Sequence, residues 1–170
     1  LWQTLPETPV KHDCVKLIFD LQTTNDRSLA EFAYAYLENL YKNDPSFLQK
    51  IKLVGLREKK MFPCVIGNFE LLAHMKVGNF FLHNGGWGIG EVIDVSMLRE
   101  QITLEFDNVS GSKEISFSNA FKTLIPISKD HFLAKRFGDP DAFEVFAKEN
   151  PLETMRILLR DLGPKTAQEI

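Results

Sequence analysis

Apolar residues recur with a helical period through the first third of the chain. The clearest run occupies positions i, i+3, i+4, i+7, i+8 and i+11, and consists of Leu29, Phe32, Ala33, Tyr36, Leu37 and Leu40. That spacing aligns the side chains along one face of an α-helix. Before the run, Thr23-Thr24-Asn25-Asp26 supplies residue types that cap a helix. Weaker patterns predict further helices over residues 10–21, 47–54 and 63–75.

The helix predicted over residues 10–21 carries one apolar stripe, formed by Val10, Cys14, Leu17, Ile18 and Leu21. Such a stripe is typical of the side that packs against the rest of a protein. Four helices with short connections indicate two stacked helical hairpins. Val15-Lys16-Leu17-Ile18 resembles Ile51-Lys52-Leu53-Val54, which favours a tetratricopeptide-like pair of repeats.

The apolar period changes from helical to alternating in the middle of the chain. Ile102, Leu104 and Phe106 alternate with polar residues, which is typical of a half-buried strand. Further strands are predicted over 80–83, 88–95 and 123–127, and another contains Ile115 and Phe117. Turns are predicted at 84–86, at 96–100 and at Ser110-Gly111. Five short strands with tight turns predict a small SH3-like or Tudor-like five-stranded β-barrel.

The last third is predicted to be helical again. Ser128 is placed to cap a helix that ends at Gly138, and Asp139-Pro140 begins the next. Asn150, Pro151 and Glu153 are close to a capping box for a third helix. The fold class is therefore α+β, with a repeat-like helical region over 1–75, a β-barrel over 76–127 and C-terminal helices over 128–170.

Composition and charge indicate which classes of binding partner are expected. The chain has 170 residues, 44% hydrophobic and 25% charged, with a net charge of −3, as expected of a globular protein. The predicted barrel holds four basic and six acidic residues, so direct nucleic-acid binding is not expected. The one basic cluster is interpreted as a solvated helix end, and comprises Lys50, Lys52, Arg57, Lys59 and Lys60.

Neither a signal peptide nor a membrane span is recognisable in the sequence. Cys14 and Cys64 are expected to be buried thiols in a reducing cytosol rather than a disulfide. The chain starts at Leu1 without methionine and stops in what resembles the first turn of a helix before Ile170. We therefore expect a fragment of a longer protein.

No motif indicates catalysis, a metal or a cofactor. The glycine run of residues 85–90 lies between two predicted strands, whereas a phosphate-binding loop precedes a helix. The four histidines lack metal-ligand spacing. His83, at a strand end, is expected to bond to local backbone. The protein is therefore predicted to be no enzyme and to carry no cofactor and no metal ion.

The hairpin tip over residues 96–100 is unusual because it contains Met97 and Leu98. Hairpin tips favour glycine, asparagine and aspartate. These two side chains are expected either to pack against the flanking helices or to contact a partner.

The run from Val77 to Val92 resembles the start of the CarD-type RNA polymerase interaction domain. Gly78, His83 and the glycine hairpin match the family pattern, while Trp87 stands where the family usually has histidine. The resemblance implies a Tudor-like β meander over residues 76–127. It also implies docking on the β-subunit lobe of bacterial RNA polymerase.

Nearly the whole chain resembles the long N-terminal extension of chlamydial-type Gre transcript cleavage factors. The match is carried by the helical first third, by His83 to Val92, by Ala134 to Asp141 and by Leu158 to Ile170. Gre factors rescue backtracked polymerase with an acidic coiled-coil tip that holds magnesium. No such hairpin occurs here, so the cleavage-stimulating residues are expected downstream of Ile170.

These observations predict a non-catalytic module that docks a Gre-type elongation factor on RNA polymerase, in the bacterial cytoplasm and at the nucleoid through polymerase. We expect strand addition at a sheet edge near Gly88 to Val95. The candidate contacts are Phe81, His83, Trp87, Met97, Leu98 and Arg99. The alternative is a helical-repeat scaffold that binds another protein through a groove around Tyr34, Tyr36 and Tyr41, with the hairpin tip covered.

Overall fold

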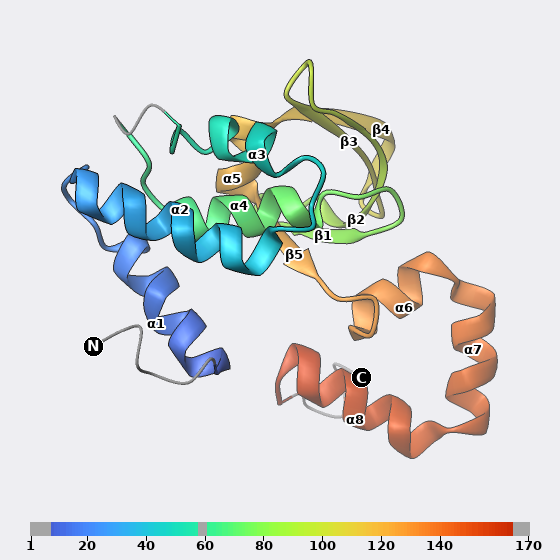
Figure 1. The fold of residues 1–170 in the computed structure, drawn as a ribbon. Coiled ribbons are helices and arrows are strands. Elements are labelled where there is room, and N and C mark those ends of the chain that lie inside the picture. The colour runs from blue at the N-terminus through green and yellow to red at the C-terminus, as the bar shows by residue number, and fades with distance from the viewer. Residues whose placement is uncertain (1–7, 58–60, 165–170) are drawn as a thin grey trace. The chain divides into compact units, whose positions relative to one another are not determined.

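The computed structural model describes residues 8–57 and 61–164. Over these residues the chain forms eight helices and five strands, so the predicted α+β class is confirmed. The chain divides into two compact units, Leu1–Ala73 and His74–Ile170. We call them the helical unit and the sheet unit, and Figure 1 traces both in chain order.

The four helices predicted in the first third are all present: α1 (Pro9–Asp20), α2 (Arg27–Tyr41), α3 (Phe47–Leu53) and α4 (Val65–His74). Side-chain caps begin the first two. The Thr8 hydroxyl accepts the Lys11 amide at 3.2 Å, and the Asp26 carboxylate accepts the Ser28 amide at 2.6 Å. These bonds satisfy amide groups that have no partner within the helix.

Helix α1 does not pack through its apolar stripe, so the prediction of its packing face is wrong. Val15 and Phe19 are fully buried, whereas Val10, Leu17 and Leu21 are 69%, 56% and 70% exposed. The helix therefore packs through a different face from the apolar stripe. On that inner face the Lys16 ammonium reaches Glu70 of α4 at 2.9 Å, so a polar contact accompanies the two buried apolar side chains.

The cysteines and one lysine also depart from expectation. Both thiols are free, as expected, but Cys14 belongs to the outer stripe of α1 and is exposed, while Cys64 is half-buried. Lys50 is not part of a solvated cluster, because its side chain is buried against Asp44. Lys52 and Arg57 are exposed, and Lys59 and Lys60 lie outside the described residues.

Five antiparallel strands form the sheet in the order β4-β3-β2-β1-β5. They are β1 (Phe80–His83), β2 (Gly88–Ser96), β3 (Gln101–Phe106), β4 (Val109–Ser116) and β5 (Leu124–Ile127). The sheet is open, with β4 and β5 at its two edges. The predicted alternation in β3 is confirmed, because Ile102, Leu104 and Phe106 are all buried.

The end of the meander differs from the prediction at two points. Phe117 begins a helix, α5 (Phe117–Thr123), instead of continuing the strand. Its amide donates to the Glu100 carbonyl at 2.8 Å and its ring is buried, which ends β4 there. The β3–β4 turn lies at Asp107 and Asn108, and the predicted turn residues Ser110 and Gly111 are inside β4.

Three further helices complete the sheet unit: α6 (Phe132–Gly138), α7 (Pro140–Glu149) and α8 (Pro151–Leu162). Helix α6 covers one face of the sheet, where Ala134 joins a buried cluster with Phe80, Ile89 and Ile127. Helix α8 packs on α6 through Ile157 and Leu158 against Phe132. No helix among residues 8–57 and 61–164 is long and apolar enough to span a bilayer.

The caps of these helices are only partly as predicted. Asp139 caps α7 by accepting the Ala142 amide at 2.9 Å, as expected. His131, not Ser128, caps α6, and its Nδ1 accepts the Leu133 amide at 3.1 Å. Asn150 makes no side-chain cap bond at the start of α8, so the predicted capping box does not form.

Candidate partner-binding site

Two surface features of the sheet unit carry the predicted contact residues: the glycine hairpin between β1 and β2, and the tip between β2 and β3. In the glycine hairpin the His83 and Trp87 rings stack with their centroids 4.3 Å apart and their planes at 10°. The Phe106 ring of β3 lies edge-on to both, at 5.7 Å and 5.4 Å. The three rings form one aromatic cluster.

The glycines of this hairpin are required by close packing rather than by a ligand. At Gly88 the backbone φ is +78°, and a Cβ atom would lie 1.8 Å from the Asp107 carboxylate. A Cβ atom at Gly90 would lie 2.6 Å from the Phe106 ring. The glycines therefore let β2 approach the β3–β4 turn and let the aromatic cluster close.

His83 is held as a neutral imidazole. Its Nδ1 atom accepts the Gly85 amide at 3.0 Å, which confirms the predicted bond to local backbone and leaves the proton on Nε2. Burial lowers the pKa of His83 below its usual 6.5. A neutral ring stacked on Trp87 is suited to packing and to donating one hydrogen bond from Nε2.

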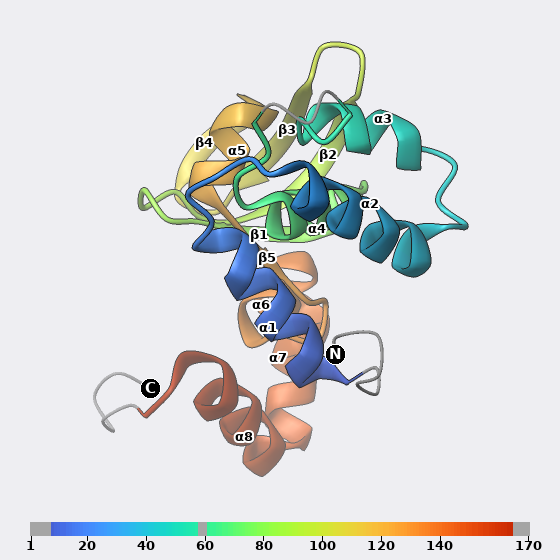
Figure 2. The same cartoon turned by 60° about the vertical axis from the view of Figure 1, so that its left-hand side comes forward.

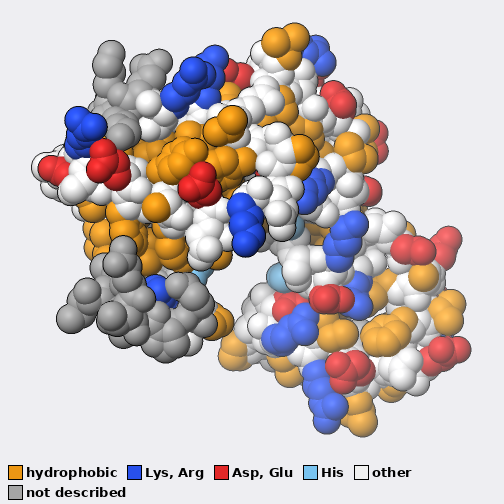
Figure 3. Space-filling model, viewed as in Figure 1, with side chains coloured by type: hydrophobic (Ala, Val, Ile, Leu, Met, Phe, Trp, Pro, Cys, Tyr) orange, Lys and Arg blue, Asp and Glu red, His pale blue; other side chains and the backbone are white. Residues whose placement is uncertain are grey.

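The β2–β3 tip presents apolar and basic side chains to solvent. Leu98 is 93% exposed, Met97 is half-buried and Arg99 is exposed. The Arg99 amide donates to the Ser96 hydroxyl at 3.3 Å, which closes the turn. An apolar group beside a basic one stands at this tip in Figure 3. Within the sheet unit, Leu98 therefore does not pack against the flanking helices, which was one of the two alternatives for the tip.

The structure does not bring all six candidates together. The nine residues of β2 separate the glycine hairpin from the tip, a span of about 26 Å. Figures 1 and 2 show the two loops at different ends of the sheet. Phe81 is fully buried and lies edge-on to His74 at 5.0 Å, so it supports the sheet and offers no contact surface.

The strand expected to offer an edge near Gly88 to Val95 is not an outer strand of the sheet. Strand β2 is internal, with β1 paired to Gly88–Glu91 on one side and β3 paired to Gly90–Ser96 on the other. The outer edges belong to β4 and β5. Pro126 of β5 has no backbone N–H group, so β5 lacks one hydrogen-bond donor. In the described part of the chain, β4 is therefore the edge best able to accept an added strand.

Edge β4 connects the two candidate surfaces. Its last residue, Ser116, pairs with Gln101 next to the tip. Its first residue follows Asn108, whose amide donates to the Trp87 carbonyl at 3.4 Å. This edge could not be predicted from the sequence, because alternating hydrophobicity indicates strands but does not give their order in a sheet.

Other chemistry has little support among the described residues. Within residues 8–57 and 61–164, no three His, Cys, Asp or Glu side chains are grouped to hold a metal ion.

The three tyrosines of the alternative scaffold do not share one groove. The Tyr36 hydroxyl bonds to His12 at 2.9 Å, whereas Tyr34 and Tyr41 pack on Phe47 and Phe69 from another side of α2.

Comparison with known proteins gives matches over the whole chain. It is 49% identical over 170 residues to a protein of Chlamydia pneumoniae named transcription elongation factor GreA. It is 46% identical over 170 residues to the protein of the same name from Chlamydia trachomatis serovar D. The chain spans 24% of the length of each, about a quarter. No family model and no solved structure matches it. The chain is thus similar to proteins named transcription elongation factor GreA over about a quarter of their length.

Proposed function

We propose that the chain is a non-catalytic region of a Gre-type elongation factor, and that its sheet unit docks the factor on bacterial RNA polymerase. The similarity to proteins named transcription elongation factor GreA supports the elongation role. The observation that carries the docking role is the solvent-exposed β2–β3 tip, where Leu98 is 93% exposed. The proposal requires no cofactor or metal ion and locates the protein in the cytoplasm, at polymerase.

The tip has the chemistry of a protein contact. A leucine fully exposed at a turn gains free energy when a partner removes it from water, on the order of 1.5–3 kcal/mol for complete burial. Arg99 beside it supplies a charge that can orient the partner. Such a pair is more useful for recognising protein than for binding nucleic acid, which needs clustered cations.

Strand addition at β4 completes the proposed mode of docking. An added strand obtains its affinity from backbone hydrogen bonds, and flanking side chains select the partner. In this arrangement the tip and the aromatic cluster of His83, Trp87 and Phe106 stand at the two ends of the same edge. The partner we propose is the β-subunit lobe of polymerase.

The strand order supports the finer assignment to a CarD-like, Tudor-like domain. The last strand pairs with the first, and a short helix precedes it, so that β4 and β5 are brought to opposite edges. A small barrel arises when such a meander curls. In this proposal the family pattern at the hairpin consists of His83 and the glycines from Gly85 to Gly90.

The docking role is tested by capture of the 170-residue chain on the purified polymerase β lobe. The doubly substituted tip, Met97→Asp with Leu98→Asp, is expected to weaken binding at least about tenfold. The matched control is Val145→Asp with Leu152→Asp, because those side chains are 55% and 78% exposed and lie away from the tip. Equal binding by both double variants, or no capture of the unsubstituted chain, would refute docking through the tip.

The alternative function, a helical-repeat scaffold with a purely structural barrel, is less well supported. It requires a covered hairpin tip and a groove shared by Tyr34, Tyr36 and Tyr41. Leu98 is exposed, and Tyr36 is engaged by His12. These observations favour docking through the sheet unit.

A further inference from the structure

We infer that the groove between α2 and α3 is a peptide-binding site, which takes an apolar side-chain pair flanked by acidic residues from a partner protein. The groove encloses about 540 Å³ and is lined by Glu31, Tyr34, Leu48, Ile51, Leu56 and Arg57. It lies wholly within the helical unit. The inference is therefore independent of the docking role proposed for the sheet unit.

The floor of the groove is built by the way α3 ends. The Gly55 amide donates to the Lys52 carbonyl at 3.0 Å, and the Leu56 amide donates to the Ile51 carbonyl at 3.1 Å. With Gly55 at φ +76°, this pair of bonds is a Schellman motif. The motif brings Leu56 back beside Ile51, and both side chains are only 2% exposed.

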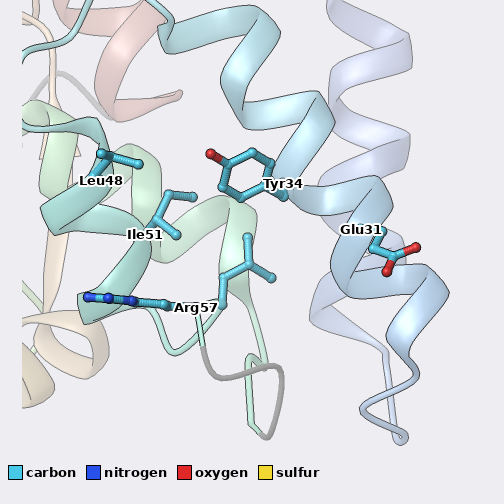
Figure 4. A pocket seen from close by; sticks show the side chains of 6 residues that line it. Glu31, Tyr34, Leu48, Ile51 and Arg57 are labelled. Atoms are coloured by element: carbon cyan, nitrogen blue, oxygen red, sulfur yellow. The ribbon is translucent and has the colours of Figure 1, made fainter.

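The walls are apolar and come from two helices. Figure 4 shows Tyr34 of α2 facing Leu48 and Ile51 of α3 across the hollow. The Tyr34 ring is fixed by an edge contact with Phe47, with centroids 5.7 Å apart. Leu48 is 70% exposed at the rim, an arrangement that leaves an apolar side chain in water until a ligand covers it. The volume is in the usual range for ligand sites and can admit two neighbouring apolar side chains.

The charges around the groove determine the kind of peptide. Glu31 is held by Arg27 at 2.9 Å, and in Figure 4 its carboxylate points away from Tyr34. On the opposite side, the exposed Arg57 lines the groove, while the charge of Lys50 is offset by Asp44. The α3 side of the rim is therefore positive. An acidic residue next to the inserted apolar pair would complement it.

The test measures peptide binding to the whole 170-residue chain by fluorescence anisotropy. The probe is a short labelled synthetic peptide in which a Leu-Phe pair is flanked by glutamates, and its twin carries lysines instead. We expect the acidic peptide to bind and the lysine twin to bind at least about tenfold more weakly. Amide resonances of Tyr34, Leu48 and Arg57 are expected to shift on binding.

Substitutions distinguish specific peptide binding in the groove from non-specific binding elsewhere on the chain. Leu48→Glu is expected to weaken binding at least about tenfold, and Arg57→Glu to reduce or reverse the preference for the acidic twin. Leu21→Glu is the matched control, because Leu21 is also 70% exposed but lies outside the groove. Its binding is expected to be unchanged. Thermal unfolding of each variant checks that the fold is retained.

Several outcomes would overturn the site. They are no binding of the acidic peptide, equal binding of the lysine twin, an unaffected Leu48→Glu variant, or a Leu21→Glu variant that is equally impaired. Sedimentation is measured in parallel. A dimer that Leu48→Glu dissociates would mean that a second copy of the chain, not a peptide, fills the groove. Binding of the polymerase β lobe in the same preparation distinguishes failure here from failure of the docking role.

Discussion

The Lys50 ammonium lies 2.5 Å from the Asp44 carboxylate, with only 7% and 18% of the two side chains exposed. The same carboxylate accepts the Ser46 amide at 2.9 Å and the Ser46 hydroxyl at 2.7 Å, just before α3 begins. One aspartate thus fixes the start of α3 and neutralises a lysine in the middle of it. Because α3 forms one wall of the peptide groove, this pair also supports the groove.

We expect Asp44 to stabilise the fold most strongly above pH 4. Burial raises the pKa of Asp44, but hydrogen bonds from Lys50 and Ser46 outweigh it and lower the pKa from 3.8 to about 2. The folded state therefore prefers the ionised form, and this stabilisation is lost as the pH falls from about 4 to about 2. Urea unfolding between pH 6 and pH 2 measures the loss, on the order of 1–2 kcal/mol.

Substitution gives an independent measure of the same pair. Asp44→Ala leaves Lys50 buried without its partner and should cost about 2–4 kcal/mol at neutral pH. The control is Glu144→Ala, which removes an ion pair with Lys148 of the same 2.5 Å length but with side chains 66% and 73% exposed. It should cost less than about 0.5 kcal/mol. Equal losses would mean that burial of the Asp44 pair is unimportant.

Gly88→Ala should disrupt the glycine hairpin, because the new Cβ would strain a φ of +78° and collide with Asp107. We expect a loss of more than about 2 kcal/mol and a changed near-ultraviolet signal from Trp87. Gly86→Ala is the control, since φ is +88° there but no atom lies within 4 Å of the added Cβ. It should cost only the backbone strain, about 1–2 kcal/mol. A loss for Gly88→Ala no greater than the control's would exclude the collision.

The sequence predicted the kinds of elements better than their faces and neighbours. Periodicity was sufficient for α1 to α4 and for β3, because local spacing reflects local geometry. It failed for the buried face of α1, where Val15 and Phe19 are inside although the longer apolar stripe is on the other side. It also failed for β2, since strand order depends on contacts distant in sequence. Within the candidate site, Met97 and Leu98 marked the tip as unusual but did not decide between packing and exposure, and edge β4 could not be predicted.

Because α1 packs through a face other than its apolar stripe, substitutions in the stripe are expected to have little effect on stability. Leu17→Glu with Leu21→Glu removes two leucines of the longer apolar stripe, yet both are more than half exposed. The double variant should change the free energy of unfolding by less than about 0.5 kcal/mol. Phe19→Ala, on the buried face, should cost about 3–5 kcal/mol. Chemical denaturation of the two variants distinguishes the faces, and strong destabilisation by the double variant would restore the original stripe as the packing face.

The stack of His83 on Trp87 should make tryptophan emission report the protonation of the histidine. The chain has two tryptophans, so Trp2→Phe leaves Trp87 as the sole emitter. Burial lowers the pKa of His83, and protonation would also remove the Nδ1 acceptor of the Gly85 amide. The neutral ring therefore stabilises the hairpin fully above pH 6.5, and this contribution is lost as the pH falls through the lowered pKa. We expect Trp87 emission to be quenched with a midpoint below pH 6.5 and His83→Phe to abolish the transition. A midpoint at or above pH 6.5, or a transition that persists in His83→Phe, would contradict the neutral stacked imidazole.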